Sequence, residues 1–263
     1  MVVNKTIVNK DTKMNTNPNK TSTSINTMNQ TSTSKANMIT KLRLSFIPTL
    51  ILGSTLSLIL SFLLNLTLSP TSFAAPTTFT VTNTNDSGAG SLRQAIEDAN
   101  SNGNPGDQDV IEFNIPGFGD QVIEPASNLT ITQSVLIDGY TQSDAEENTD
   151  QSPNPFTGFL RIELNLINSG AIVVSGSNVT LKGLAINRAP EDSYGLHAIN
   201  AHNLKIYGNY FNVDTTGLIR RGYQEQKANI YIENSNNVEI GGSQPERRNI
   251  ISWCDGACIE AFG

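Results

Sequence analysis

The chain is poor in the residue types that metal and redox sites use most. It has 263 residues but only two cysteines and two histidines. His197 and His202 have no cysteine or acidic partner at metal-ligand spacing, which argues against a bound metal. No compact group of three acidic residues beside a basic one is visible, although a polysaccharide-degrading enzyme would need such a set. We therefore expect no cofactor.

Basic residues are also scarce beyond the N-terminal segment. Residues 1–74 carry a net charge of +6, whereas the remainder has ten basic and 23 acidic side chains, a net charge of −13. This division indicates that the two parts of the chain have separate roles. Because the acidic part would repel a phosphate backbone, we expect no nucleic-acid partner.

Large apolar side chains are almost absent from residues 1–40, which are dominated by Asn, Thr, Ser and Lys. Such a segment cannot bury enough surface to offset the entropy lost on ordering, so we predict a disordered leader. Met38 offers a conventional start just before the next segment. Our hypothesis is that translation begins there.

A secretory signal is predicted over residues 41–75. Two basic residues precede an apolar run over residues 44–68, and a proline and small residues follow it. This order is typical of a signal peptide cleaved between Ala74 and Ala75. The alternative is an uncleaved membrane anchor, because the run is long enough to span a bilayer. Both readings predict a secreted or cell-surface protein that contacts a membrane only through the apolar run.

From Ser127 onward the chain repeats itself. Four segments share a small polar residue, an apolar-x-apolar group and a nearby glycine. Their equivalent apolar positions are separated by 44, 25 and 34 residues and are Ile137, Leu181, Ile206 and Ile240. A period near 25 with longer intervals predicts one coil per repeat plus loop insertions. We place the insertions from Tyr140 to about Ser169 and from about Val213 to Lys227.

The repeats predict an all-β solenoid, a parallel β-helix over residues 127–263. Each repeat is too short to bury its own apolar face, whereas stacked coils bury alternating Val, Ile and Leu in one column. The regular leucine spacing of a leucine-rich repeat is absent. The chain stops inside what looks like a newly begun coil, so we predict that the solenoid is incomplete at its C-terminus and belongs to a longer protein.

Residues 76–126 are predicted to form an N-terminal cap region with one helix, over residues 91–100. Leu92, Ile96 and Ala99 share a face of this helix by their spacing. The serine before Leu92 can cap its first turn. Because the terminal coil of a solenoid exposes apolar core and strand edges, we expect the helix to cover that end.

Two further features concern the stacking of coils. Asn178, Asn203 and Asn237 take the same place in successive coils, which predicts a structural ladder of stacked asparagines. Cys254 and Cys258 could close a small loop as a disulfide in an oxidising compartment. Two reduced thiols are the alternative, and geometry must decide between them.

Several segments resemble a known family. Residues 82–96 resemble the N-terminal region of bacterial secreted right-handed β-helix proteins of the CSLREA type, in the pectate-lyase-like superfamily. The cysteine usual in that motif is absent here. Residues 208–217 are similar to the family's "GNYIGTDATG" repeat, and residues 237–242 with 248–252 to its "NTIGG…RNVIS" repeat. The resemblance implies a right-handed parallel β-helix and export, and it implies no particular reaction.

Candidate catalytic residues are few. Asn148-Thr149-Asp150 matches a tripeptide of β-helix polygalacturonases, but it lies in a predicted insertion without the other residues such enzymes need, which favours coincidence. Asp138 and Asp214 close coils, and Arg220-Arg221 follows the second. Together they could bind calcium and a uronate as in a lyase. Solvated turn residues are the favoured interpretation, because no third acid accompanies them.

Two functions remain open at this level. The favoured one is a non-catalytic module for adhesion or carbohydrate contact, with an extracellular polysaccharide or another surface protein as partner. The alternative is a polysaccharide lyase or glycoside hydrolase acting on acidic glycans, with calcium only in the lyase. Five aromatic residues could form a sugar-stacking surface, although core or loop packing is favoured for most of them; they are Tyr194, Tyr207, Tyr210, Phe211 and Tyr223.

Overall fold

The described part of the computed structural model excludes most of the leader. It comprises residues 2–3, 5–7, 75–102, 107–151, 154, 156–221, 227–254 and 257–263. All of these belong to one compact unit, residues 1–10 with 73–263. The predicted signal and Ala74 lie outside the described residues, whereas Ala75 is exposed.

Three parallel sheets contain almost all of the strands. Sheet A consists of β5 (Gln121–Ile123), β8 (Ile162–Asn165), β11 (Leu184–Asn187), β14 (Tyr210–Phe211) and β17 (Asn249–Ile251). Sheet B consists of β3 (Thr78–Val81), β4 (Asp109–Phe113), β7 (Val135–Asp138), β10 (Thr180–Lys182), β13 (Lys205–Tyr207) and β16 (Val238–Ile240). Sheet C consists of β6 (Leu129–Ile131), β9 (Ile172–Val174), β12 (Tyr194–Ile199), β15 (Ala228–Glu233) and β18 (Ile259–Phe262).

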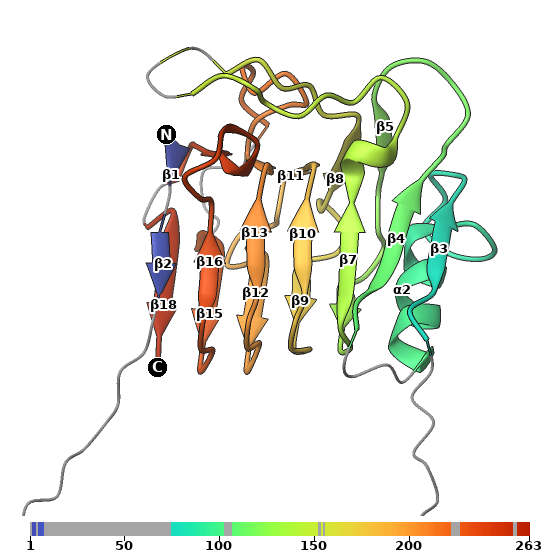
Figure 1. The fold of residues 1–263 in the computed structure, drawn as a ribbon, viewed down its shortest axis with the longest axis horizontal. Helices are drawn as coiled ribbons and strands as arrows, with labels where there is room; N and C mark the ends of the chain where they lie inside the picture. The colour runs from blue at the N-terminus through green and yellow to red at the C-terminus, as the bar shows by residue number, and fades with distance from the viewer. Residues whose placement is uncertain are drawn as a thin grey trace, which may run out of the picture. The chain divides into compact units, whose positions relative to one another are not determined.

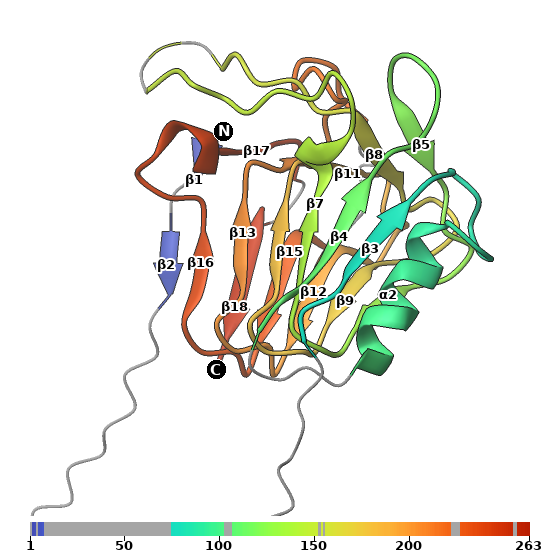
Figure 2. The same cartoon turned by 45° about the vertical axis from the view of Figure 1, so that its right-hand side comes forward.

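The chain visits the sheets in a fixed order. After β3 it passes through sheets B, A and C in turn, first as β4, β5 and β6 and finally as β16, β17 and β18. Each round of three strands is one coil, and the coils stack side by side (Figures 1 and 2). The described part of the chain is therefore all-β, with three parallel sheets and one α-helix, an arrangement consistent with a parallel β-helix solenoid.

The predicted register of the repeats is confirmed in sheet B. Leu181 pairs with Ile137 on one side and with Ile206 on the other, and Ile206 pairs with Ile240. All four side chains are 2% exposed or less. The same apolar position therefore stacks from coil to coil, as the spacing of the repeats requires.

The core is a continuous column of Val, Ile and Leu between the three sheets. It reaches from Val81 and Phe113 in the first coils to Ile240 and Ile251 in the last. Full burial of each such side chain contributes about 1.5–3 kcal/mol. Stacked coils share this column, which explains how repeats too short to fold alone are stabilised.

The predicted helix is confirmed, and α2 (Leu92–Asn102) ends two residues later than expected. Leu92, Ile96 and Ala99 are buried, and the α2 helix contacts β3 and β6, the first strands of sheets B and C (Figure 2). The backbone N–H of Gln94 donates to Ser91 Oγ at 3.2 Å, so Ser91 caps the helix.

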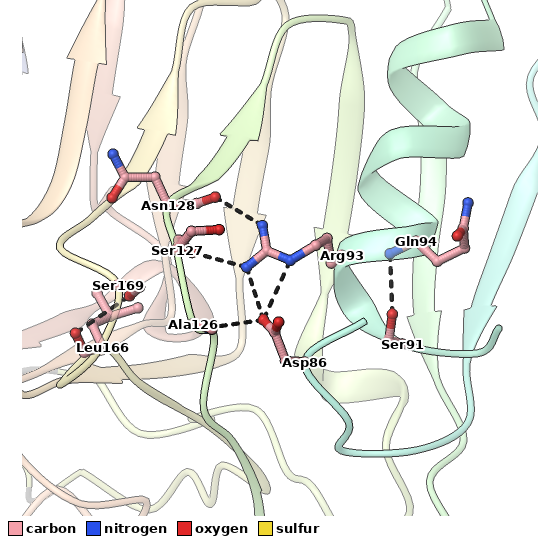
Figure 3. A network of polar contacts seen from close by, with 9 residues as sticks. All are labelled: Asp86, Ser91, Arg93, Gln94, Ala126, Ser127, Asn128, Leu166 and Ser169. Carbon is pink, nitrogen blue, oxygen red and sulfur yellow. Dashed lines mark hydrogen bonds and ion pairs between the residues drawn. The ribbon is translucent and has the colours of Figure 1, made fainter. Parts of the chain in front are cut away.

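Arg93 fastens the helix to the first coil (Figure 3). Its guanidinium donates to Asp86 at 2.8 Å and to the backbone carbonyls of Ser127 and Asn128 at 2.9 and 3.0 Å. Asp86 also accepts from the backbone N–H of Ala126 at 2.9 Å. The hydrogen bond from Arg93 and that from Ala126 hold the pKa of Asp86 below its ordinary value.

Strand β8 lies inside a segment that the sequence predicts to be an insertion. The prediction of a loop from Tyr140 to about Ser169 is wrong at Ile162–Asn165, where all four residues are buried. The insertion is shorter and contains the 3₁₀ helix η1 (Gly139–Thr141). In the predicted cap region, β4 and β5 already belong to the parallel sheets.

The N-terminal leader contributes two short strands at the opposite end from α2. β1 (Val2–Val3) pairs antiparallel with β17, and β2 (Lys5–Ile7) pairs antiparallel with β16. The sequence predicts disorder for these residues, and the structure differs there. They cover the last strand edges of sheets A and B.

Both insertions cross the outer face of sheet A. Residues 146–160 and 213–219 meet where the backbone N–H of Leu160 donates to the carbonyl of Thr215 at 3.2 Å (Figure 1). Beneath them lies a second, smaller hydrophobic cluster of Leu160, Ala185, Tyr210 and Val213. Tyr210 is fully buried and packs edge-on against Phe156, with ring centroids 5.3 Å apart. The outer face of sheet A is thus covered over β11 and β14, whereas Val122 on β5 is 40% exposed.

Candidate functional site

The described side chains leave two outer sheet faces for contact with a ligand. The insertions cover sheet A over β11 and β14, so the outward Ala185 and Tyr210 pack inside the molecule. Sheet B presents mainly charged groups. Sheet C presents a group of aromatic rings, which we call the aromatic platform: Tyr194, His197, Tyr231 and Phe262.

The rings of the platform touch one another across three neighbouring strands. Tyr194 and Tyr231 are stacked, with centroids 4.5 Å apart and an interplanar angle of 24°. His197 meets Tyr231 edge-on at 5.2 Å, and Phe262 lies 5.6 Å from Tyr231 on the other side. Phe262 is 58% exposed. Such pairs stabilise neighbouring strands, and they also assemble apolar surface at the outside of the molecule.

Strand register places these residues on one face. His197 pairs with Tyr231, Tyr231 pairs with Glu260, and Glu233 pairs with Phe262. Side chains alternate along a strand, so Ile230 and Ile232 point into the core while Tyr231 and Glu233 point out. The sequence pattern of β15 and β18 therefore dictates an outward row of aromatic and acidic groups.

A glycine brings Tyr194 to the same face as His197, although their spacing of three positions would place them on opposite faces of a regular strand. Gly195 is buried between them, and a Cβ there would lie 2.8 Å from the carbonyl oxygen of Asn229. Only glycine fits this close approach of two strands. The irregularity of β12 is thus built into the sequence beside the platform.

Carboxylates surround the rings. Partial burial and then the charges of Glu260 and Glu233 raise the pKa of the Tyr194 phenol above its ordinary value. Burial and then the charge of Glu233 also raise the pKa of the Tyr231 phenol. His197 Nε2 lies 3.8 Å from a Glu233 oxygen. The platform therefore combines apolar surface with a negative potential.

On the outer face of sheet B, a lysine and two carboxylates form the group that most resembles a catalytic cluster among the described residues. Lys182 Nζ lies 2.8 Å from Asp138 and 3.4 Å from Glu147. Burial acts to lower the pKa of Lys182, but Asp138 and Glu147 outweigh it and raise the pKa above its ordinary value. The lysine is therefore protonated and neutralises its partners, and it is a poor general base. Among the described residues, no group of three His, Cys, Asp or Glu side chains is arranged to hold a metal ion.

Of the predicted lyase-like residues, Asp214 and Arg220 have structural partners, and the charge of Arg221 helps to lower the pKa of Asp214. Asp214 accepts hydrogen bonds from Thr216 at 2.7 Å and from the backbone N–H of Leu218 and Ile219. Burial alone would raise its pKa, but these hydrogen bonds lower it below the ordinary value. Arg220 instead lies over the Trp253 ring, 4.7 Å from its centroid. Asp214 therefore fixes a turn.

The Asn148-Thr149-Asp150 tripeptide is likewise structural in its contacts. Asn148 is 1% exposed, and its side chain donates to the carbonyls of Asp150 and Pro245 at 3.0 and 2.9 Å. It accepts from the backbone N–H of Thr157 at 2.9 Å. These bonds fix the first insertion against η2 (Pro245–Arg247).

The predicted asparagines form a chain of hydrogen bonds at the corner between sheets C and B. Asn203 Nδ2 donates to Asn178 Oδ1 at 2.9 Å, and Asn237 Nδ2 donates to Asn203 Oδ1 at 2.8 Å. All three have φ between 56° and 58°, the left-handed conformation that asparagine tolerates.

A second pair of asparagines, which sequence reasoning missed, lies inside the protein between sheets B and A. Asn209 and Asn249 are fully buried. Asn249 Oδ1 accepts from the backbone N–H of Asn209 at 2.9 Å, and Asn209 Oδ1 accepts from that of Leu184 at 3.1 Å. The sequence does contain a signal for this pair: each asparagine directly precedes two large hydrophobic or aromatic residues of a sheet A strand, Tyr210-Phe211 and Ile250-Ile251.

Cys254 and Cys258 form a disulfide, with Cα atoms 5.1 Å apart. The bond closes the turn that leads from β17 into β18, the strand that carries Phe262. Asn229 Nδ2 donates to Cys254 Sγ at 3.1 Å. The disulfide thus lies at the start of β18, the strand whose last residue is Phe262 of the aromatic platform.

Two of the five aromatic residues considered for a sugar-stacking surface are interior. Tyr210 and Phe211 are fully buried, and Tyr207 lies beneath Arg247 at 4.9 Å. Tyr223 lies outside the described residues. Only Tyr194 belongs to the platform, whereas sequence reasoning did not identify the other three members: His197, Tyr231 and Phe262. Their proximity depends on pairing between distant segments.

Comparison with known proteins gives no assignment. No family model matches the chain, and neither the curated proteins nor the solved structures include a significant match. Among the described residues, no helix has the length and apolar character needed to cross a membrane. The class of protein therefore rests on the architecture itself, an all-β chain of three parallel sheets.

Proposed function

We propose that the protein is a secreted or cell-surface right-handed parallel β-helix, related to the CSLREA-type proteins that its motifs resemble. The fixed order of sheets B, A and C and the stacked register support the β-helix. The signal-like segment over residues 41–75 supports export. The disulfide between Cys254 and Cys258 agrees with an oxidising compartment.

The proposed activity is non-catalytic contact with carbohydrate through the aromatic platform. The observation that carries it is the cluster of four rings on an uncovered sheet face. Phe262 offers apolar surface to the C–H groups of a sugar ring, and the Tyr194 and Tyr231 hydroxyls and the Glu233 carboxylate can bond its hydroxyls. A long repetitive face suits an elongated glycan.

The lyase or hydrolase alternative has weaker support. Such an enzyme needs unpaired acids and a base converging on one groove. Here Lys182 forms ion pairs with Asp138 and Glu147. Asp214 accepts hydrogen bonds from residues of its own turn. The fold alone does not supply an enzymatic function.

A glycan array with the full chain tests the proposal. Tyr231→Ala and Phe262→Ala should each weaken binding at least tenfold, because each removes part of the apolar surface. Phe118→Ala is the matched control, since Phe118 is 99% exposed in the loop between β4 and β5, away from sheet C. Equal binding by all variants, or release of unsaturated uronates from an acidic glycan, would refute the proposal.

A further inference from the structure

The charges beside the aromatic platform indicate which glycans it binds. The Glu233 side chain is 38% exposed, and Glu260 is paired beside Tyr231 on the outer face of β18. Asp192 precedes β12 and is 79% exposed. Lys227 Nζ lies 3.8 Å from Asp192 and offsets part of its charge. Negative charge therefore outweighs positive charge around the rings.

We infer that the platform selects glycans that carry protonated amino groups, such as polymers of glucosamine, an inference that rests on the proposed function. An ammonium group gains from the electron-rich ring faces of a tyrosine cluster and from neighbouring carboxylates. An N-acetylated sugar of the same backbone loses both contributions. A uronate adds repulsion from Glu233 and Glu260.

The geometry of the sheet suits a repeated cation. Neighbouring parallel strands lie about 4.8 Å apart, a spacing close to the length of one sugar unit in an extended β-linked chain. Tyr194 and His197 stand on β12, Tyr231 on β15 and Phe262 on β18. A glycan that crosses these strands can therefore place successive amino groups beside the side chains of successive strands.

One buried nitrogen lies beneath this surface. His197 Nε2 has no solvent contact and no hydrogen-bond partner, and its nearest carboxylate oxygen, on Glu233, is 3.8 Å away. The Glu233 side chain is 38% exposed, so its carboxylate is accessible to a hydrogen-bond donor on a ligand. Glu233 and Glu260 are thus the two selectivity residues that the inference names.

Biosensor binding of three hexasaccharides to the full chain tests the inference: glucosamine, N-acetylglucosamine and galacturonate. Contacts with two or three partly exposed charges should make the glucosamine hexamer bind about tenfold more tightly than the N-acetylated one. Galacturonate should bind most weakly. The double variant Glu233→Gln with Glu260→Gln should remove the preference for glucosamine. Glu97→Gln, on the exposed face of α2, should leave it unchanged.

Each alternative result overturns a distinct statement. Equal affinity for the glucosamine and N-acetylglucosamine hexamers would overturn the selectivity and leave carbohydrate contact intact. Binding of oligolysine without binding of the glucosamine hexamer would replace the glycan by a basic peptide. Failure of every oligosaccharide to bind would overturn both the inference and the proposed function.

Discussion

Replacement of Asn209 by alanine is expected to destabilise the protein severely. Its side chain makes three hydrogen bonds: Nδ2 donates to the carbonyls of Leu181 at 2.7 Å and Tyr207 at 3.1 Å, and Oδ1 accepts from the N–H of Leu184 at 3.1 Å. Asn209 is fully buried. Water cannot readily replace these bonds.

The magnitude follows from the bonds that are lost. A buried hydrogen bond contributes about 1 kcal/mol net, and each partner left unsatisfied costs about 1–3 kcal/mol. We expect Asn209→Ala to lower the free energy of unfolding by about 3–5 kcal/mol, a large part of the total for a typical domain. Backbone strain adds nothing, because Asn209 is not among the residues with positive φ.

Denaturant unfolding of the full chain, followed by circular dichroism, measures the change. Asn203→Gly is the matched control, because Asn203 is exposed and glycine tolerates its φ of 58°. That variant removes ladder hydrogen bonds in contact with solvent and should cost less than about 1 kcal/mol. The reasoning fails if the two variants lose the same stability.

Three further changes test other parts of the account. Leu92→Asp places a charge at a 1% exposed position of α2 and should cost about 3 kcal/mol or more, with aggregation seen by light scattering; unchanged melting would argue against the cap. Gly195→Ala should cost about 1–3 kcal/mol in the same unfolding assay, because its Cβ would meet the carbonyl of Asn229, and a neutral effect would contradict that close approach. Replacing Ala74 by a bulky residue should block processing and leave a larger membrane-held precursor on a gel, so a mature form of normal size would show that the cleavage site is misplaced.

Periodicity explains why much of the fold could be predicted from the sequence. Ile137, Leu181, Ile206 and Ile240 share one pattern with glycine after it, and that local pattern fixes their stacking. Strand β8 escaped prediction because it follows a long polar insertion. Apolar and polar residues alternate along β8, but the strand is only four residues long and follows a polar, proline-containing segment that indicates a loop.

The candidate site could not be predicted in the same way. Tyr231 and Phe262 meet only because β15 pairs with β18 after the chain has passed through two other strands. Which sheet face stays uncovered depends on where the insertions fold. In this protein they cover β11 and β14 of sheet A and bury Tyr210, for which the sequence left a sugar-stacking role open beside the favoured core or loop packing.

The most direct test of carbohydrate contact on sheet C is hydroxyl-radical footprinting of the full chain with a bound oligosaccharide. The account predicts protection of Tyr231 and Phe262 in the complex. Phe118, in the loop between β4 and β5, should react equally with and without ligand. Protection of Tyr140 and Tyr207 near sheet B instead, with Tyr231 and Phe262 unchanged, would contradict the central claim.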